Sequence, residues 1–196
     1  MKKFLTIFDI TYTGVFVALM TIGAKISIPT PIVVITFQLA FACLGSLILG
    51  VKRTVIGLIV YTLMGLVGIP VFATGGGFAY AIAPSFGYVL GFIFAGLVTS
   101  LIVEYLYKKK PFMQKSATAF PVLIGLALLN LTIVNLIGIP YLFMIKDVYM
   151  DVPFAQAALT ALIVSTIPKD AALVTLAAFA AVKLRPALLA HNVVNA

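Results

Sequence analysis

Long apolar stretches with no polar face alternate with short breaks along the whole chain. A helix needs about 20 mostly apolar residues to cross a bilayer. The short alternating segments of a membrane β-barrel are absent. The pattern therefore predicts an all-α polytopic membrane protein, a single domain over residues 1–196 with six transmembrane helices. The predicted helices are Ile10–Ile26, Phe37–Val51, Thr54–Val71, Gly87–Tyr107, Phe120–Ile145 and a stretch that follows Pro168 and ends near Lys183 to Pro186.

The composition supports a membrane location and argues against a nucleic-acid partner. Hydrophobic residues make up 63% of the chain and charged residues only 9%, whereas a soluble domain has about 25% charged residues. The net charge of +8 would suggest nucleic acid in a soluble protein. Here the basic residues sit in short clusters between apolar runs, so they indicate membrane topology and the lipid bilayer as a partner.

The distribution of lysine and arginine predicts the orientation. With six spans, three basic residues fall on one side, namely Lys25, Lys146 and Lys169. The other side holds ten: Lys2, Lys3, Lys52, Arg53, Lys108, Lys109, Lys110, Lys115, Lys183 and Arg185. Because cytoplasmic loops carry the excess of basic residues, both termini are expected in the cytoplasm.

The three connections on the external side do not have the composition of polar loops. They are Ser27–Thr36, Phe72–Phe86 and Lys146–Lys169, and the second is rich in glycine and aromatic residues. Glycine lets the backbone approach a ligand closely, and aromatic side chains offer flat apolar surfaces with a polar tip. We therefore expect the external loops to cap a ligand pocket.

Polar side chains in or near the spans are the candidates for ligand contact, because they are costly there. Lys25 is either a ligand contact or a lysine reaching the membrane interface. Lys169 and Asp170 bind ligand, or form an interfacial ion pair or a helix N-cap. Asn135 lies toward the external end and has either role, whereas Asn130 is expected to link helices.

Three further features complete the residue-level interpretation. Asp9 and Glu104 lie near the cytoplasmic surface and are expected to be solvated. The sequence lacks a phosphate-binding P-loop, and its single histidine, His191, excludes a His-based metal site or catalytic pair; no enzyme activity, metal or cofactor is expected. Gly14 and Ala18 form a small-residue pair that allows close helix packing.

Three segments of the chain together form a recognisable pattern. The first runs from Thr30-Pro31 to Ile35-Thr36-Phe37-Gln38. The second comprises Gly68-Ile69-Pro70-Val71-Phe72, Gly75-Gly76-Gly77 and Pro84-Ser85-Phe86-Gly87-Tyr88-Val89-Leu90-Gly91-Phe92. The third is Ile167-Pro168-Lys169-Asp170. In this order the segments resemble the BioY family, the biotin-binding S-components of energy-coupling factor (ECF) transporters, and the resemblance covers nearly the whole chain.

The resemblance implies six helices whose external loops close over biotin, in a prokaryotic plasma membrane. Asp170 would accept hydrogen bonds from the ureido N–H groups of biotin. Gly14 and Ala18 match a family motif that would dock the chain on a membrane coupling protein carrying two cytosolic ATPases. The positions that match the substrate site are Gln38, Gly75, Gly76, Gly77, Tyr88 and Asp170, and the rings that would pack on biotin are Phe72, Phe78 or Tyr80.

The sequence also departs from the family pattern. Leu173 occupies a position where the family often has lysine, so Lys169 or Lys25 would supply the cation for the ligand carboxylate. Phe86 replaces a usual glycine, and Val34 a usual proline. These departures keep two alternatives open: an S-component for another small vitamin such as lipoate, and a stand-alone secondary carrier or membrane scaffold.

Overall fold

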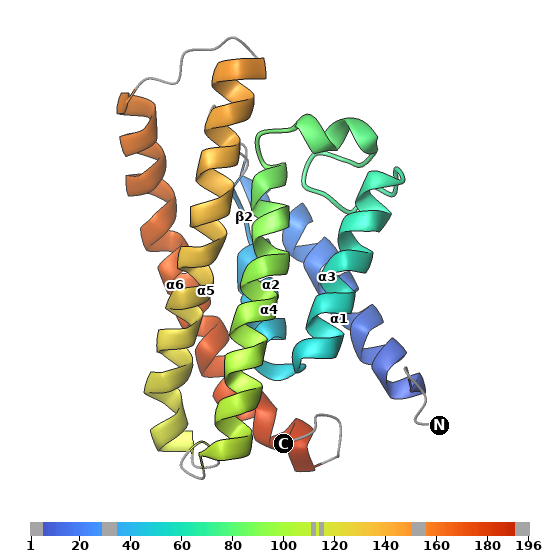
Figure 1. The fold of residues 1–196 in the computed structure, drawn as a ribbon, viewed down its shortest axis with the longest axis vertical. Helices are drawn as coiled ribbons and strands as arrows, with labels where there is room; N and C mark the ends of the chain where they lie inside the picture. The colour runs from blue at the N-terminus through green and yellow to red at the C-terminus, as the bar shows by residue number, and fades with distance from the viewer. Residues whose placement is uncertain (1–5, 29–34, 111–112, 114–115, 150–155, 191–196) are drawn as a thin grey trace.

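The structure, a computed structural model, describes residues 6–28, 35–110, 113, 116–149 and 156–190, and these residues are almost entirely helical (Figure 1). Its six α-helices are α1 (Ile7–Lys25), α2 (Gln38–Ile48), α3 (Val51–Leu66), α4 (Phe86–Lys109), α5 (Ser116–Phe143) and α6 (Gln156–Ala190). The shorter elements are β1 (Ser27–Ile28), β2 (Ile35–Thr36), the 3₁₀-helix η1 (Phe78–Ile82) and the π-helix η3 (Met144–Tyr149). β1 and β2 pair antiparallel, with Ser27 opposite Thr36.

Four helices of the described chain are long and apolar enough to cross a membrane. They are Ile7–Lys25, Phe86–Lys109, Thr118–Asp147 and Thr166–Leu188. α2 has 11 residues and α3 has 16, so at about 1.5 Å per residue they span about 16 and 24 Å of a hydrocarbon core of about 30 Å. α2 packs against all five other α-helices. Its surroundings are therefore mostly protein, and a full membrane span is not required of it.

Two predicted boundaries are wrong. Pro168 does not start the last helix, because α6 begins at Gln156 and runs through it. Consequently η3 and the first turns of α6 occupy most of the predicted Lys146–Lys169 loop. The second wrong boundary is the break between the second and third predicted helices, which was expected at Lys52 and Arg53. These two residues lie in the first turn of α3, and the break comes at Gly50, with φ 80°. Helices packed in a membrane protein tolerate proline because neighbouring groups satisfy the freed backbone.

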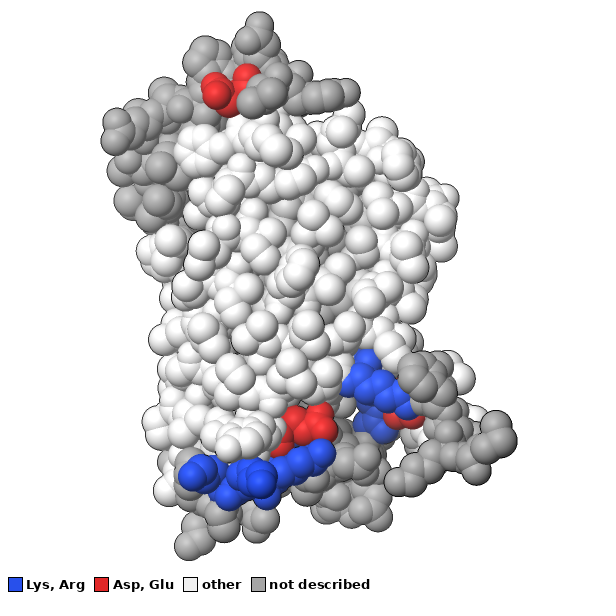
Figure 2. All heavy atoms as spheres, viewed as in Figure 1, with Lys and Arg blue, Asp and Glu red and all other residues white. Residues whose placement is uncertain are grey.

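One end of the molecule gathers most of the basic side chains (Figure 2). The Arg53 Nε of α3 lies 2.7 Å from Asp9 Oδ1 at the start of α1. The Arg185 Nη1 of α6 donates to Leu47 O over 2.6 Å, and its guanidinium lies 4.1 Å from the Tyr107 ring centroid. The starts of α1 and α3 therefore share one end with the ends of α2, α4 and α6. The expectation that Asp9 is solvated is wrong, because its side chain is 10% exposed.

α4 and α5 form the most extensive helix pair and shape one wall of the pocket described below. A Cβ atom at Gly91 would lie 3.0 Å from Val134 O, and one at Gly138 would lie 2.5 Å from the Tyr88 ring. Asn130, which is 1% exposed, joins the pair by donating to Thr99 Oγ1 over 3.1 Å. The prediction that Asn130 links helices is confirmed.

Candidate ligand pocket

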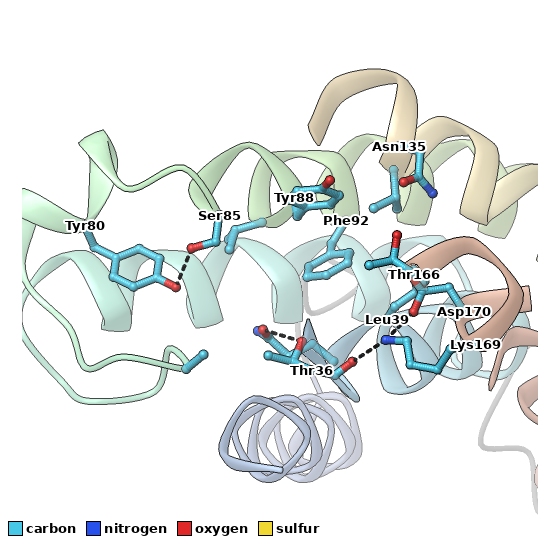
Figure 3. A pocket seen from close by; sticks show the side chains of 14 residues that line it. Thr36, Leu39, Tyr80, Ser85, Tyr88, Phe92, Asn135, Thr166, Lys169 and Asp170 are labelled. Atoms are coloured by element: carbon cyan, nitrogen blue, oxygen red, sulfur yellow. Dashed lines mark hydrogen bonds and ion pairs between the residues drawn. The ribbon is translucent and has the colours of Figure 1, made fainter. Parts of the chain in front are cut away.

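A partly open pocket lies away from the basic cluster, between the starts of α2 and α4, the second half of α5 and the middle of α6. Figure 3 shows the side chains that line it. The free space among its side chains is about 650 Å³, counting the side that opens to solvent. Five parts of the chain meet there: β2, the start of α2, the loop before α4, the α4–α5 pair and α6. The lining residues are Thr36, Gln38, Leu39, Ala73, Tyr80, Ser85, Tyr88, Val89, Phe92, Val134, Asn135, Thr166, Lys169 and Asp170.

An ion pair on α6 provides the charged wall. Lys169 Nζ lies 2.6 Å from Asp170 Oδ1, and the two side chains are 28% and 15% exposed. Lys169 Nζ also donates to the backbone oxygen of Thr36 over 3.4 Å, across the pocket mouth (Figure 3). The ion pair that the sequence offered as an alternative to a ligand role is present, and the ligand role stays a prediction. The N-cap alternative is wrong, because α6 is already helical before Pro168.

Thr36 in β2 and Gln38 at the start of α2 form the opposite polar wall. Thr36 Oγ1 donates to Gln38 Oε1 over 3.3 Å. Gln38 Nε2 donates to Tyr61 Oη over 2.5 Å, and Tyr61 Oη donates to Val71 O over 2.8 Å. Gln38 and Tyr61 are 6% and 0% exposed. A buried hydrogen-bond chain thus connects the pocket to the loop that follows α3.

Aromatic rings enclose the remaining sides. Tyr80 and Ser85 are joined by a hydrogen bond of 3.0 Å between their hydroxyl oxygens (Figure 3). The Tyr80 ring stacks on Phe72, with 4.3 Å between centroids. Phe72 is completely buried, whereas Tyr80 and Tyr88 line the cavity. Phe92 and Tyr88 come from the same face of α4 as Val89, so the α4 wall combines apolar and phenolic surface.

The three consecutive glycines of the loop before α4, Gly75, Gly76 and Gly77, shape the backbone near the pocket but do not line it. Gly75 and Gly77 have φ of 124° and 118°, values that other residues rarely adopt. A Cβ atom at Gly76 would lie 2.3 Å from Ile69 O. Phe78 is 81% exposed and is not among the residues that line the pocket. The three glycines therefore allow the turn that brings Tyr80 to the pocket, and the structure does not bring Phe78 into it.

Lys25 and the small-residue pair also lie outside the pocket lining. Lys25 Nζ donates to Phe72 O over 2.9 Å and so ties the end of α1 to the loop. Gly14 and Ala18 line a separate apolar groove between α1 and α3. A Cβ atom at Gly14 would meet no atom within 4 Å, so this part of the groove is open.

The pocket also contains residues that the sequence interpretation did not select. Thr36 and Ser85 stand inside the quoted motifs, next to residues that were selected. Phe92 closes the same motif, whereas Thr166 sits one turn before Asp170 on α6. Within the described residues, no three His, Cys, Asp or Glu side chains are placed to hold a metal ion.

The fold and the site together define a class of protein. It is a helical membrane protein whose bundle holds a polar pocket with aromatic walls. The sequence model described as the BioY family matches residues 1–190. The chain therefore belongs to the BioY family.

Relatives and a solved structure support this assignment. The chain is 34% identical over 140 residues to a protein of Lysinibacillus sphaericus named "Probable biotin transporter BioY", covering 70% of this chain and 66% of that one. It is 40% identical over 100 residues to the "Biotin transporter BioY" of Thermotoga maritima, covering 50% and 57%. The chain thus matches less than two thirds of the length of either relative.

The fold resembles the crystal structure of an S-component for biotin from an ECF-type ABC transporter. The TM-score is 0.71, and the match covers 90% of each chain at 21% sequence identity. At this identity the likeness establishes the fold alone.

Proposed function

We propose that this chain binds biotin and is the substrate-specific subunit of an ECF-type transporter for biotin uptake, energised by separate ATPase subunits. The observation that carries the proposal is the convergence of Asp170, Gln38 and the aromatic rings on one pocket in a BioY-family fold. Biotin combines a ureido ring with two N–H groups, a thioether ring and a carboxylate tail. Each of these parts has a complementary group in the pocket.

Asp170 is the acceptor for the ureido N–H groups. A carboxylate accepts stronger hydrogen bonds than a neutral oxygen, and the pairing with Lys169 keeps Asp170 charged in a partly buried site. Tyr80, Tyr88 and Phe92 supply the flat surface for the fused rings. Within the described residues, Lys169 is the cation that lines the pocket, so the ligand carboxylate competes with Asp170 for it.

The orientation in the membrane follows from the two unlike ends. The basic end faces the cytoplasm of a prokaryotic cell and holds the start of α1 and the end of α6, in agreement with the positive-inside rule. The pocket then opens outward, where the external loops cap biotin, and all six helices lie within the membrane. α2 and α3 are the short members of this set. α2 does not need a full membrane span because other helices surround it.

The groove between α1 and α3 is the docking surface for the membrane coupling protein with its two cytosolic ATPases. It holds about 1290 Å³ of free space, counting its open side, and is lined almost entirely by apolar side chains. Gly14 and Ala18 are exposed within it. Small residues let a partner helix approach closely, which is a main source of helix association in lipid.

Uptake of radiolabelled biotin tests the proposal in a biotin-requiring cell that supplies an ECF coupling protein and ATPases. We expect Gly14→Leu to abolish uptake and to leave biotin binding by the purified chain unchanged. Gly125→Leu is the matched control, because Gly125 in α5 is also exposed and open around its Cβ position. Normal uptake by Gly14→Leu would contradict the docking surface. Uptake without ATPases would favour a stand-alone carrier.

A further inference from the structure

The hydrogen-bond chain behind the pocket fixes which end of the Gln38 amide faces the ligand. Val71 O is a backbone carbonyl and can only accept, so it takes the single hydroxyl hydrogen of Tyr61 over 2.8 Å. Tyr61 Oη then has only lone pairs left for Gln38, 2.5 Å away. The Gln38 group at that contact must therefore be its NH₂, which leaves Gln38 Oε1 on the side of Thr36 and the cavity.

The same reasoning applies to the second amide in the pocket wall. Asn135 Nδ2 donates to Leu131 O over 2.9 Å, and this backbone oxygen can only accept. Asn135 Oδ1 is thus the end of the amide that remains for other contacts. Asp170 is also an acceptor when ionised, whereas Lys169 is already shared between Asp170 and Thr36 O. The fixed polar groups of the pocket are therefore mostly oxygens that need N–H or O–H partners.

We propose that Tyr61 is a positioning residue that sets ligand specificity: it holds Gln38 with its oxygen toward the cavity, so that the pocket selects a ligand head that carries N–H donors. This inference rests on the proposed function and names the chemistry that the pocket reads. A ureido ring offers two N–H groups to these oxygens. The dithiolane ring of lipoate offers none and would leave the remaining lone pairs of these oxygens without a donor, which is the strongest ground on which a polar site rejects an analogue.

A merely structural role for Tyr61 makes a different prediction. Its ring packs edge-on against Phe72 at 5.5 Å, and its hydroxyl holds Val71, so its loss would also loosen the loop. Loosening weakens the binding of every ligand by a similar factor. Loss of Gln38 orientation instead weakens only those ligands that donate to Gln38 Oε1. The discrimination between ligands, rather than affinity alone, is therefore the informative quantity.

The experiment measures dissociation constants of biotin and of its two derivatives methylated at one ureido nitrogen, with the purified full-length chain. Tyr61→Phe is expected to weaken biotin about tenfold, the cost of one misdirected hydrogen bond. The derivative that cannot donate to Gln38 should change by less than about twofold. Tyr107→Phe is the control, because Tyr107 is a buried tyrosine at the opposite end of the bundle.

Gln38→Leu and the double variant show whether Tyr61 acts through Gln38. If it does, the double variant binds biotin no more weakly than Gln38→Leu alone, because the two losses are not additive. Additive losses, or equal losses for biotin and both derivatives, would overturn the inference and leave the proposed function standing. Should Tyr61→Phe fail to fold, Gln38→Leu alone decides, and an equal loss for all three ligands overturns the inference. A folded wild-type chain that does not bind biotin overturns both.

Discussion

Among the described residues, Asp9 at the start of α1 and Asp170 in the middle of α6 are both partly buried, and their surroundings differ sharply. Asp9 accepts from Arg53 Nε at 2.7 Å, from Lys52 Nζ at 3.3 Å and from the backbone N–H of Thr6 at 2.9 Å. Asp170 has Lys169 as its hydrogen-bonding partner within the described chain, and it lines a cavity. Their side chains are 10% and 15% exposed, so burial alone does not separate them.

The difference is in the remaining capacity to accept hydrogen bonds. Three donors, two from α3 and one from the N-cap of α1, surround the Asp9 carboxylate, which therefore joins α1 to α3. Asp170 keeps lone pairs for a ligand, and the neighbouring Lys169 favours its charged form. A buried charge that is completely paired serves the fold, and one that is half paired beside a cavity is available for binding.

The largest expected effect is that of Asp170→Asn on biotin affinity. The change replaces the charged acceptor of the ligand N–H groups by a neutral one and weakens the pairing with Lys169, which costs about 2–5 kcal/mol, or about 1.5 to 3.5 orders of magnitude in Kd. Calorimetric titration of the purified variant measures this loss. Its thermal unfolding should stay close to wild type, and an affinity within about threefold of wild type would remove Asp170 from the binding site.

The converse effect is expected for Asp9→Asn. The change removes the charged partner of Arg53 in a partly buried site, so the free energy of unfolding should fall by about 3 kcal/mol. Biotin affinity should be unchanged, because Asp9 lies at the far end of the bundle. Unfolding in detergent, followed alongside titration, checks both. Reduced affinity in a folded Asp9→Asn protein would break the distinction between the two ends.

A smaller and more selective effect is expected for Lys169→Gln. The loss of the cation should weaken biotin by about tenfold more than biotin amide, since only biotin carries a carboxylate. Asp170→Asn should weaken biotin amide at least as much as biotin, because it acts on the ureido ring and frees Lys169 for the carboxylate of biotin. Competition of the two ligands against radiolabelled biotin measures the ratio. If Lys169→Gln weakens both ligands equally, Lys169 pairs with Asp170 and does not contact the ligand carboxylate.

The smallest effect is expected for Asn130→Leu. Interhelical hydrogen bonds in membranes contribute about 0.6 kcal/mol on average, and the bond from Asn130 to Thr99 is the one removed. A small loss of stability with unchanged biotin affinity is the expected result in the same unfolding and titration assays. A large loss of affinity would mean that the pocket extends deeper between α4 and α5.

The helices could be predicted from the sequence because the apolar stretches are long and nearly uninterrupted. The predicted stretch Gly87–Tyr107 lies within α4, one residue after its start and two before its end. Pro168 misled the boundary of α6, because proline is a helix breaker in water and only packing against other helices makes it tolerable. Sequence alone does not show that packing.

The charged wall of the pocket could also be predicted, since Lys169 and Asp170 are conspicuous in an apolar segment. The glycine-rich loop was harder, because glycine serves both close ligand approach and positive φ, and here the second use explains Gly75 and Gly77. Tyr61 carries no signal in sequence. It lies 23 residues from Gln38, and only the fold brings the two together.

Titration of biotin into the purified, detergent-solubilised chain, with no ATPase subunit present, tests the central claim most directly. The account predicts saturable binding of one biotin per chain, with lipoate unable to displace it. It predicts in addition that Asp170→Asn weakens this binding by about 1.5 to 3.5 orders of magnitude in a folded protein and that Asp9→Asn leaves it unchanged. A monodisperse, folded wild-type sample that does not bind biotin, or from which lipoate displaces biotin at equal concentration, would contradict it.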